Sequence, residues 1–225
     1  MKNIIYNTKF LGNNYGGFPC DVSLLNKDSI ILGFGVGPDI SFDKDIIRLT
    51  DATVELFDFT PNSIKMFKGT KNTIFNEYGI SDFDGMLEVF QDNPKVFSKW
   101  PSWLGFGKTE SYPVKSISTI MKEKNINHID LLKMDVEGEE YKVIPNMFDS
   151  KIFPTQICME FHPFHLDGSI HSEDFISTAK EHGVKSHEEV FELILKYYTL
   201  AGRSLKNNKP DNEYCFILKE KLKNA

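Results

Sequence analysis

The sequence contains little cysteine, no long apolar run and no concentration of basic charge, and each absence excludes a class of protein. Three cysteines, Cys20, Cys158 and Cys215, are spread over 225 residues without a C-x-x-C pair. We therefore expect free thiols, with no zinc or redox motif and no structural disulfide. No apolar run approaches the ~20 residues that span a bilayer, and residues 1–10 lack the apolar core of a signal peptide. The expectation is a cytoplasmic protein without a membrane span.

Charge and composition narrow the class further. The formal net charge is −6, and the lysines and arginines are scattered among the acidic residues. Without a basic stripe, the chain is not expected to bind the phosphate backbone of nucleic acid. Hydrophobic residues make up 40% of the chain, which is enough apolar surface for the core of a single domain over residues 1–225.

Apolar, β-rich runs alternate with helix signals along the whole chain. The runs occupy residues 29–34, 53–59, 72–80, 128–135, 155–161, 197–202 and 213–220. Several are apolar at consecutive positions, which is typical of strands buried on both faces of a parallel sheet. Thr60 before Pro61 predicts one helix start, and Ser186 with Glu189 forms the S-x-x-E pattern of a capping box at another.

This alternation predicts an α/β fold of the doubly wound, Rossmann-like type, with helices on both faces of a mostly parallel sheet of about seven strands. "YYTLAGRSL" and "EYCFIL" near the C-terminus are separated only by "KNNKPDN", which is too short for a helical crossover. We therefore expect an antiparallel hairpin at the C-terminal end. Residues 85–113 show little periodicity and carry Trp100 and Trp103, so we expect a long loop that acts as a lid or a substrate wall.

A glycine-rich turn follows the first predicted buried strand. Gly33, Gly35 and Gly37 precede a segment with helical apolar spacing, and this context suits a nucleotide-like ligand. A dinucleotide fingerprint would place its third glycine where this chain has Pro38, which disfavours a pyrophosphate. Asp58 ends the next strand, 21 residues after Gly37, where a carboxylate can accept from ribose hydroxyls. The pattern fits S-adenosylmethionine (SAM) as well as NAD, with Pro38 favouring SAM.

Polar side chains end two later strands that we expect to be neighbours. Asp135, Glu160 and His162 are candidates for a general base, and the same three could bind Mg²⁺ or Mn²⁺. Glu137 is assigned to the cofactor end or to the start of the helix after Gly138, where a carboxylate offsets the helix dipole.

Other acidic and hydroxyl groups are candidates for binding the two ends of the cofactor, its adenine and its methionine part. Asp82 or Asp84 follows the third strand and could accept from the adenine amino group, and we favour Asp82. Ser41 and Asp43 either bind the methionine part or cap the first helix.

Four segments resemble the motifs of one family, the FkbM-type methyltransferases. "KMDVEGEE" closely resembles K-[IM]-D-[VI]-E-G-x-E, and "GVGPDISFD" resembles G-x-G-x-D-x-S-F-D, which includes Asp39, Ser41 and Asp43. "FDFTP" is similar to F-D-P-T-P, with Phe59 where the family pattern has proline, and "FNEYGISDFDG" matches the segment after the third strand.

This resemblance implies a class I methyltransferase fold of seven strands, with the last strand inserted antiparallel. It also implies SAM as cofactor and O-methylation of a saccharide hydroxyl or a carbohydrate-decorated natural product. A small molecule or sugar is then the partner, and an oligomer remains open. Two alternatives stand beside it: an NAD(P)-dependent oxidoreductase, which Pro38 disfavours, and a non-catalytic nucleotide-binding domain, which the presence of the strand-end acids disfavours.

Overall fold

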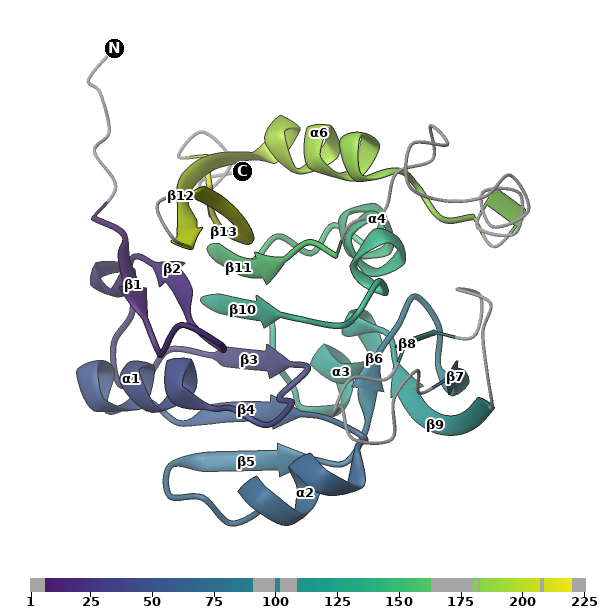
Figure 1. The fold of residues 1–225 in the computed structure, drawn as a ribbon, viewed down its shortest axis with the longest axis horizontal. Helices are drawn as coiled ribbons and strands as arrows, with labels where there is room; N and C mark the ends of the chain where they lie inside the picture. The colour runs from purple at the N-terminus through teal and green to yellow at the C-terminus, as the bar shows by residue number, and fades with distance from the viewer. Residues whose placement is uncertain are drawn as a thin grey trace.

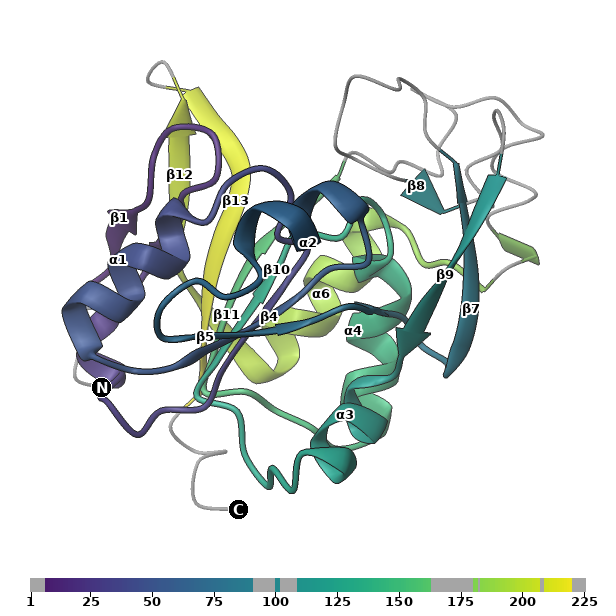
Figure 2. The same cartoon turned by 90° about the horizontal axis from the view of Figure 1, so that it is seen from below.

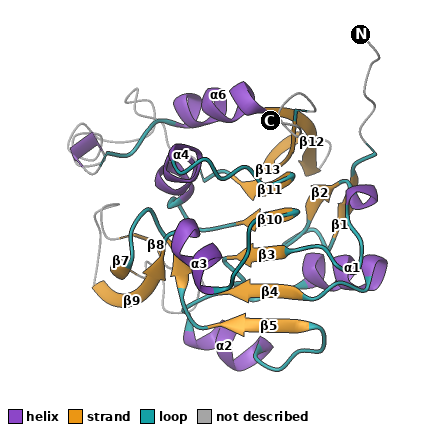
Figure 3. Ribbon diagram, turned by 180° about the vertical axis from the view of Figure 1, so that it is seen from behind, coloured by secondary structure: helices purple, strands orange, loops and turns teal. Residues whose placement is uncertain are grey.

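A computed structural model of the protein describes residues 7–90, 100–101, 109–162, 180–181, 183–206 and 209–219. Its centre is a seven-stranded sheet in the order β12-β13-β11-β10-β3-β4-β5 (Figures 1 and 3). The strands are β3 (Ile31–Phe34), β4 (Val54–Phe57), β5 (Thr73–Asn76), β10 (Leu131–Met134), β11 (Gln156–Glu160), β12 (Tyr198–Lys206) and β13 (Lys209–Leu218). The five from β11 to β5 are parallel, whereas β13 pairs antiparallel with both β11 and β12. The predicted fold class and C-terminal hairpin are therefore confirmed.

Helices cover both faces because successive side chains of each strand point to opposite sides. In β3, Ile31 packs into one apolar core while Leu32 and Phe34 pack into the other. The first core includes side chains of α1 (Ser41–Thr50) and α2 (Pro61–Phe67); the second includes α3 (Ile117–Glu123), α4 (Glu140–Asp149) and α6 (His187–Tyr197). Strands that are apolar at consecutive positions are thus buried on both faces, as their sequences indicate.

The two helix starts read from the sequence are confirmed. The helix α2 begins at Pro61 after the extended residue Thr60. In α6 the Ser186 hydroxyl accepts from the Glu189 backbone N–H at 3.2 Å, and the Glu189 carboxylate accepts from the Ser186 N–H at 2.8 Å. This reciprocal pair satisfies two N–H groups that a helix end otherwise leaves unpaired.

The expectation of a loop over residues 85–113 is wrong at both of its ends. Residues Gly85–Phe90 form β7 and Thr109–Lys115 form β9, which pair antiparallel; β8 (Trp100–Pro101) pairs with β7, and β6 (Gly79–Ile80) pairs with β9. The alternation of exposed Met86 and Glu88 with buried Leu87 and Val89 is the period of a half-buried strand. Residues 91–99 and 102–108 lie outside the described residues, so the lid role remains a prediction.

This second sheet lies beyond the carboxyl ends of the parallel strands, on the side to which their arrowheads point (Figures 1 and 2). A smaller antiparallel pair, β1 (Lys9–Leu11) and β2 (Phe18–Cys20), packs near α1 and the C-terminal hairpin and leads into the short 3-10 helix η1 (Val22–Leu24). The three cysteines are free and buried, as expected. Among the described residues, none of the helices combines the length and apolar character needed to cross a membrane.

Candidate functional site

A cavity of about 270 Å³ opens at the carboxyl ends of β3, β4, β10 and β11. Open α/β sheets bind their ligands at this edge, where the strand order reverses direction. The wall is apolar beside β6 and β7, mixed beside β4, where Asp58 and Thr60 accompany Phe57 and Phe59, and acidic beside β10 and β11. The apolar part includes Phe57, Phe59, Ile80, Leu87 and Val89, and the polar part includes Asp39, Asp43, Lys133, Asp135, Glu137, Glu139, Glu160, His162 and Glu213.

The glycine turn after β3 is shaped by two glycines in the left-handed region. At Gly35, with φ of +71°, a Cβ atom would lie 1.5 Å from the carbonyl oxygen of Asp135, so the turn and the end of β10 could not approach as they do. At Gly37, with φ of +56°, a Cβ would meet nothing within 4 Å, because this residue borders the cavity. Gly33 lies within β3, beside Asp43 and outside the described cavity wall.

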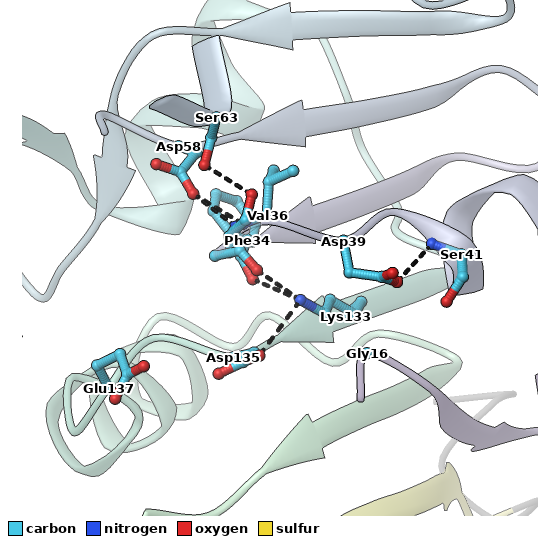
Figure 4. A network of polar contacts seen from close by, with 12 residues as sticks. Gly16, Phe34, Val36, Asp39, Ser41, Asp58, Ser63, Lys133, Asp135 and Glu137 are labelled. Atoms are coloured by element: carbon cyan, nitrogen blue, oxygen red, sulfur yellow. Dashed lines mark hydrogen bonds and ion pairs between the residues drawn. The ribbon is translucent and has the colours of Figure 1, made fainter. Parts of the chain in front are cut away.

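Asp58 braces this turn from the end of β4 (Figure 4). One carboxylate oxygen accepts from the N–H groups of Val36 and Gly37, both at 3.0 Å, and the other accepts from the Thr60 N–H at 2.6 Å. Ser63 adds a bond from its hydroxyl to the Gly37 carbonyl at 2.8 Å. Asp58 therefore lines the cavity, and its carboxylate is engaged in holding the shape of the turn.

Lys133 braces the other side of the same turn. Its Nζ donates to the Gly35 carbonyl at 2.6 Å and lies 3.9 Å from an Asp135 carboxylate oxygen (Figure 4). The same ammonium group is 5.2 Å from the centre of the Phe18 ring, within the range of a cation–π contact. Asp43 is buried nearby, where desolvation raises its pKa and the charge of Lys133 opposes that rise.

Asp39 and Ser41 join the segment after β1 to the start of α1. The Asp39 carboxylate accepts from the Ser41 N–H at 2.8 Å (Figure 4). It also accepts from the Asn13 side-chain amide at 2.6 Å. The Ser41 hydroxyl accepts from the Asn13 N–H at 2.9 Å. Burial acts to raise the pKa of Asp39, but the bonds from Ser41 and Asn13 outweigh it and lower the pKa. Asp39 borders the cavity, whereas Ser41 lies outside its described wall.

The two acids proposed for the adenine amino group are engaged elsewhere. Asp82 pairs with Lys142 at 3.0 Å, and the described cavity wall does not include it. Asp84 accepts from the Ser116 N–H at 2.7 Å and from the Thr119 hydroxyl at 2.6 Å, so it helps to hold the start of α3. Neither position supports the adenine assignment.

The polar end of the cavity centres on His162, just beyond β11. Its Nε2 lies 3.2 Å from a Glu137 oxygen and 3.7 Å from an Asp135 oxygen, and its Nδ1 lies 3.2 Å from Glu140. Glu140 is fully buried and also accepts from the backbone N–H groups of His162, at 2.9 Å, and Gly138, at 2.8 Å. Three carboxylates thus surround one imidazole.

Of the predicted metal set, Asp135 and His162 converge, but Glu137 takes the place of Glu160. One ligand atom each from Asp135, Glu137 and His162 lies within 4.8 Å of the others. The backbone of Glu137 has a left-handed φ of +53°, which is rare for a residue with a side chain. Glu160 instead ends β11 directly opposite Glu213 of β13, and both border the cavity.

Burial and the surrounding charges shift the pKa of three of these groups. Desolvation raises the pKa of Glu137 and of Glu160 to about 7; the carboxylate of Asp135 adds to both rises, and His162 opposes them. Burial acts to lower the pKa of His162, but Glu140, Glu137 and Asp135 outweigh it and raise that pKa to about 10. His162 is therefore positively charged at neutral pH, while Glu137 and Glu160 can exchange protons there.

Three acids at the site, Glu139, Glu140 and Glu213, received no role from the sequence. Glu140 orients His162, and Glu139 is buried and accepts from the Ser81 hydroxyl at 2.6 Å, joining α4 to the end of β6. A signal for Glu140 was available, because it is the final glutamate of the K-x-D-x-E-G-x-E pattern. Leu87 and Val89 were also missed, because their segment was assigned to a loop.

Comparison with known proteins identifies one family. A family model described as the methyltransferase FkbM domain matches residues 44–197, which is more than half of the chain. Among solved structures, the chain is similar to the methyltransferase FkbM from Methylobacillus flagellatus KT, with 11% identity and a TM-score of 0.48. That match covers 86% of this chain and 44% of the other chain. None of the curated proteins matches this chain.

Proposed function

Because the chain belongs to the methyltransferase FkbM domain family, we propose that it transfers a methyl group from SAM to a hydroxyl of a saccharide or saccharide precursor. Family membership implies SAM as the methyl donor. The observation that carries the proposal is the acidic rim beside the glycine turn, which includes Asp135, Glu160 and His162. This rim offers proton acceptors to a hydroxyl that must lose its proton.

The cavity fits a SAM-like cofactor in three respects. Gly37 leaves the glycine turn open to the cavity. Hydrogen bonds from the turn to Asp58 and from Lys133 to the turn hold its shape. Acidic groups border the side of the cavity beside β10 and β11. We propose that Gly35, Gly37, Asp39, Asp43 and Glu137 contact the cofactor, and that Asp58 acts through the turn. Bound SAM supplies an electrophilic methyl group, so the task of the protein is to hold the acceptor oxygen in line with it.

Glu160 is our candidate for the general base. A base works best when its pKa lies near the working pH, and the pKa of Glu160 is raised to about 7. Glu137 has a similar pKa, but it faces His162 at 3.2 Å. The charged His162 then keeps the neighbouring carboxylates in place, and its role differs from the general base expected from the sequence.

A divalent cation is a further element of this proposal. The oxygens of Asp135 and Glu137 with the Nε2 of His162 match the donors that Mn²⁺ and Mg²⁺ accept. A buried carboxylate at the other imidazole nitrogen, here Glu140, commonly orients a metal-binding histidine. When bound, the ion would take the place of the proton on Nε2 of His162, and it would lower the pKa of the acceptor hydroxyl.

Exhaustive chelation with EDTA is expected to lower turnover and added Mg²⁺ or Mn²⁺ to restore it. The measurement is the initial rate with a confirmed acceptor. Binding of S-adenosylhomocysteine under the same conditions is the control for a folded cofactor site. If chelation leaves the rate unchanged, the metal is removed from the proposal, and Asp135, Glu137 and His162 form an ion-paired cluster without a cation.

Calorimetric titration tests the cofactor. S-adenosylhomocysteine is expected to bind with a Kd in the micromolar range, or about −8 kcal/mol, and NAD⁺ to bind far more weakly. Clear binding of NAD⁺ without binding of S-adenosylhomocysteine would favour the oxidoreductase alternative. Saccharides and nucleotide sugars are then screened with SAM, and the methylated oxygen is located by mass spectrometry and NMR. Turnover confined to amine or carboxylate acceptors would overturn the proposed acceptor class.

A further inference from the structure

Tyr15 lies at the mouth of the cavity, on the loop that joins β1 to β2. It borders the cavity together with Gly16, and yet the residue is 69% exposed. A tyrosine ring has two large apolar faces, and a ring that borders a cavity while remaining open to water can offer such a face to a ligand. Tyr15 is therefore placed to contact a molecule that enters the cavity.

The loop that carries Tyr15 is fixed to the start of α1. The side-chain oxygen of Asn13 accepts from the N–H groups of Tyr15, at 2.7 Å, and Gly16, at 3.0 Å. Asn13 is itself held by its bonds to Asp39 and Ser41. A Cβ atom at Gly16 would lie 2.7 Å from an Asp39 carboxylate oxygen, so the loop approaches that residue as closely as glycine permits. With the backbone already held, a ligand that contacts Tyr15 has to order little more than one side chain.

The phenol of Tyr15 faces the acidic end of the cavity. Partial burial raises its pKa, and the carboxylates of Asp135, Glu137, Glu160 and Asp39 add to that rise. Three of these acids follow or end β10 and β11, where our candidate for the general base lies. A hydroxyl that is to be methylated must reach this end, so the acceptor and Tyr15 occupy the same part of the cavity.

A pyranose sugar offers both kinds of surface that this arrangement can bind. Its hydroxyls point outward from the ring, whereas its axial C–H groups form an apolar face that can pack on an aromatic ring. Resting on the proposed function, we propose that Tyr15 is the acceptor platform: the pyranose ring of the acceptor stacks on the phenol ring, and one of its hydroxyls reaches Glu160. The acceptor then enters from the side of the loop between β1 and β2.

The test compares Tyr15→Ala, which removes the ring, with Tyr15→Phe, which keeps the ring and removes the hydroxyl. The acceptors are methyl α-D-glucopyranoside, methyl α-D-galactopyranoside and methyl α-L-rhamnopyranoside, with SAM as the methyl donor. Tyr15→Ala is expected to raise the KM of the glycoside by about ten-fold and to leave kcat and the Kd of S-adenosylhomocysteine near the wild-type values, because it removes an apolar contact made equally in the ground and transition states. Tyr15→Phe is expected to keep the wild-type KM.

Phe83→Ala is the matched control, because Phe83 is a 38% exposed aromatic residue that the described cavity wall does not include. Saturation-transfer NMR with bound S-adenosylhomocysteine adds a readout that does not depend on turnover. Irradiation of the aromatic protons is expected to label the C–H protons on one face of the glycoside in the wild type and in Tyr15→Phe, and to label them less in Tyr15→Ala. Substitution of so exposed a residue is expected to leave the fold intact, which circular dichroism checks.

Failure of the acceptor platform and failure of the proposed function give different results. If Tyr15→Phe raises KM as much as Tyr15→Ala, the hydroxyl binds the acceptor and stacking is wrong. If Tyr15→Ala keeps the wild-type KM, or weakens S-adenosylhomocysteine in place of the glycoside, Tyr15 does not bind the acceptor. A wild-type protein that binds S-adenosylhomocysteine but neither binds nor methylates any of the glycosides would refute the saccharide class and the platform together. Without binding of S-adenosylhomocysteine, the proposed function itself fails.

Discussion

Replacing Glu160 by glutamine is expected to lower kcat by about 10²- to 10⁴-fold, the usual contribution of a general base. The amide keeps the size of the side chain and cannot take a proton from the acceptor hydroxyl. Because Glu160 borders the acidic end of the cavity, the Kd of S-adenosylhomocysteine is expected to change little. The measurements are kcat with a confirmed acceptor and the Kd from calorimetry, on the same protein preparation.

The pH profile gives this prediction a second readout. The carboxylate accepts a proton only when ionised, and its pKa is about 7, so the wild-type rate is expected to rise with pH through that value. The matched control is Glu77→Gln, which removes an exposed carboxylate paired with Lys68. Full turnover in Glu160→Gln would disprove the assignment, and a slow variant that keeps the rise near pH 7 would transfer the role to Glu137.

The sheet could be predicted from the sequence because its signals are local. Runs such as "ILGF" in β3 lack polar side chains on consecutive positions, and only a strand covered on both faces buries them all. The capping box at Ser186 and the proline after Thr60 likewise act within a few residues. The hairpin of β7 and β9 was missed because only four alternating residues carry the signal, beside a long aromatic segment.

The sequence predicts which residues belong to the site better than it predicts how those residues are arranged. Chain order places Asp135, Glu160 and His162 at one edge of the sheet, and the structure does bring them to one cavity. Sequence could not show that Glu137 adopts a left-handed φ of +53° and turns toward His162. Nor could it show that Asp58 is engaged by backbone N–H groups of the glycine turn, since that contact depends on the spacing of two strands.

Replacing Glu140 by glutamine is expected to destabilise the fold by about 3 kcal/mol at neutral pH, the scale of breaking a buried ion pair. Glu140 is fully buried, and its carboxylate lies 3.2 Å from the Nδ1 of His162. The variant leaves the charge of His162 buried with one fewer partner. The pKa of His162, about 10 in the wild type, is then expected to fall.

The sign of the pH dependence follows from that raised pKa. The stabilisation from a charged His162 is fully present below the ordinary histidine pKa of about 6.5, and it is lost as pH rises through about 10. In Glu140→Gln this loss is expected to begin at lower pH, so the two stability curves converge above pH 10. Urea unfolding between pH 6 and 10 measures the curves, and NMR of the imidazole measures the pKa.

A double-mutant cycle separates the ion pair from simple loss of packing. If Glu140 acts through His162, then Glu140→Gln costs less stability in a His162→Gln background than in the wild type, because the charge it balances is already gone. Glu77→Gln, at an exposed pair, is expected to change stability by no more than about 1 kcal/mol. Equal costs of Glu140→Gln in both backgrounds would show that the glutamate stabilises the fold only through its bonds to backbone N–H groups, those of Gly138 at 2.8 Å and of residue 162 at 2.9 Å.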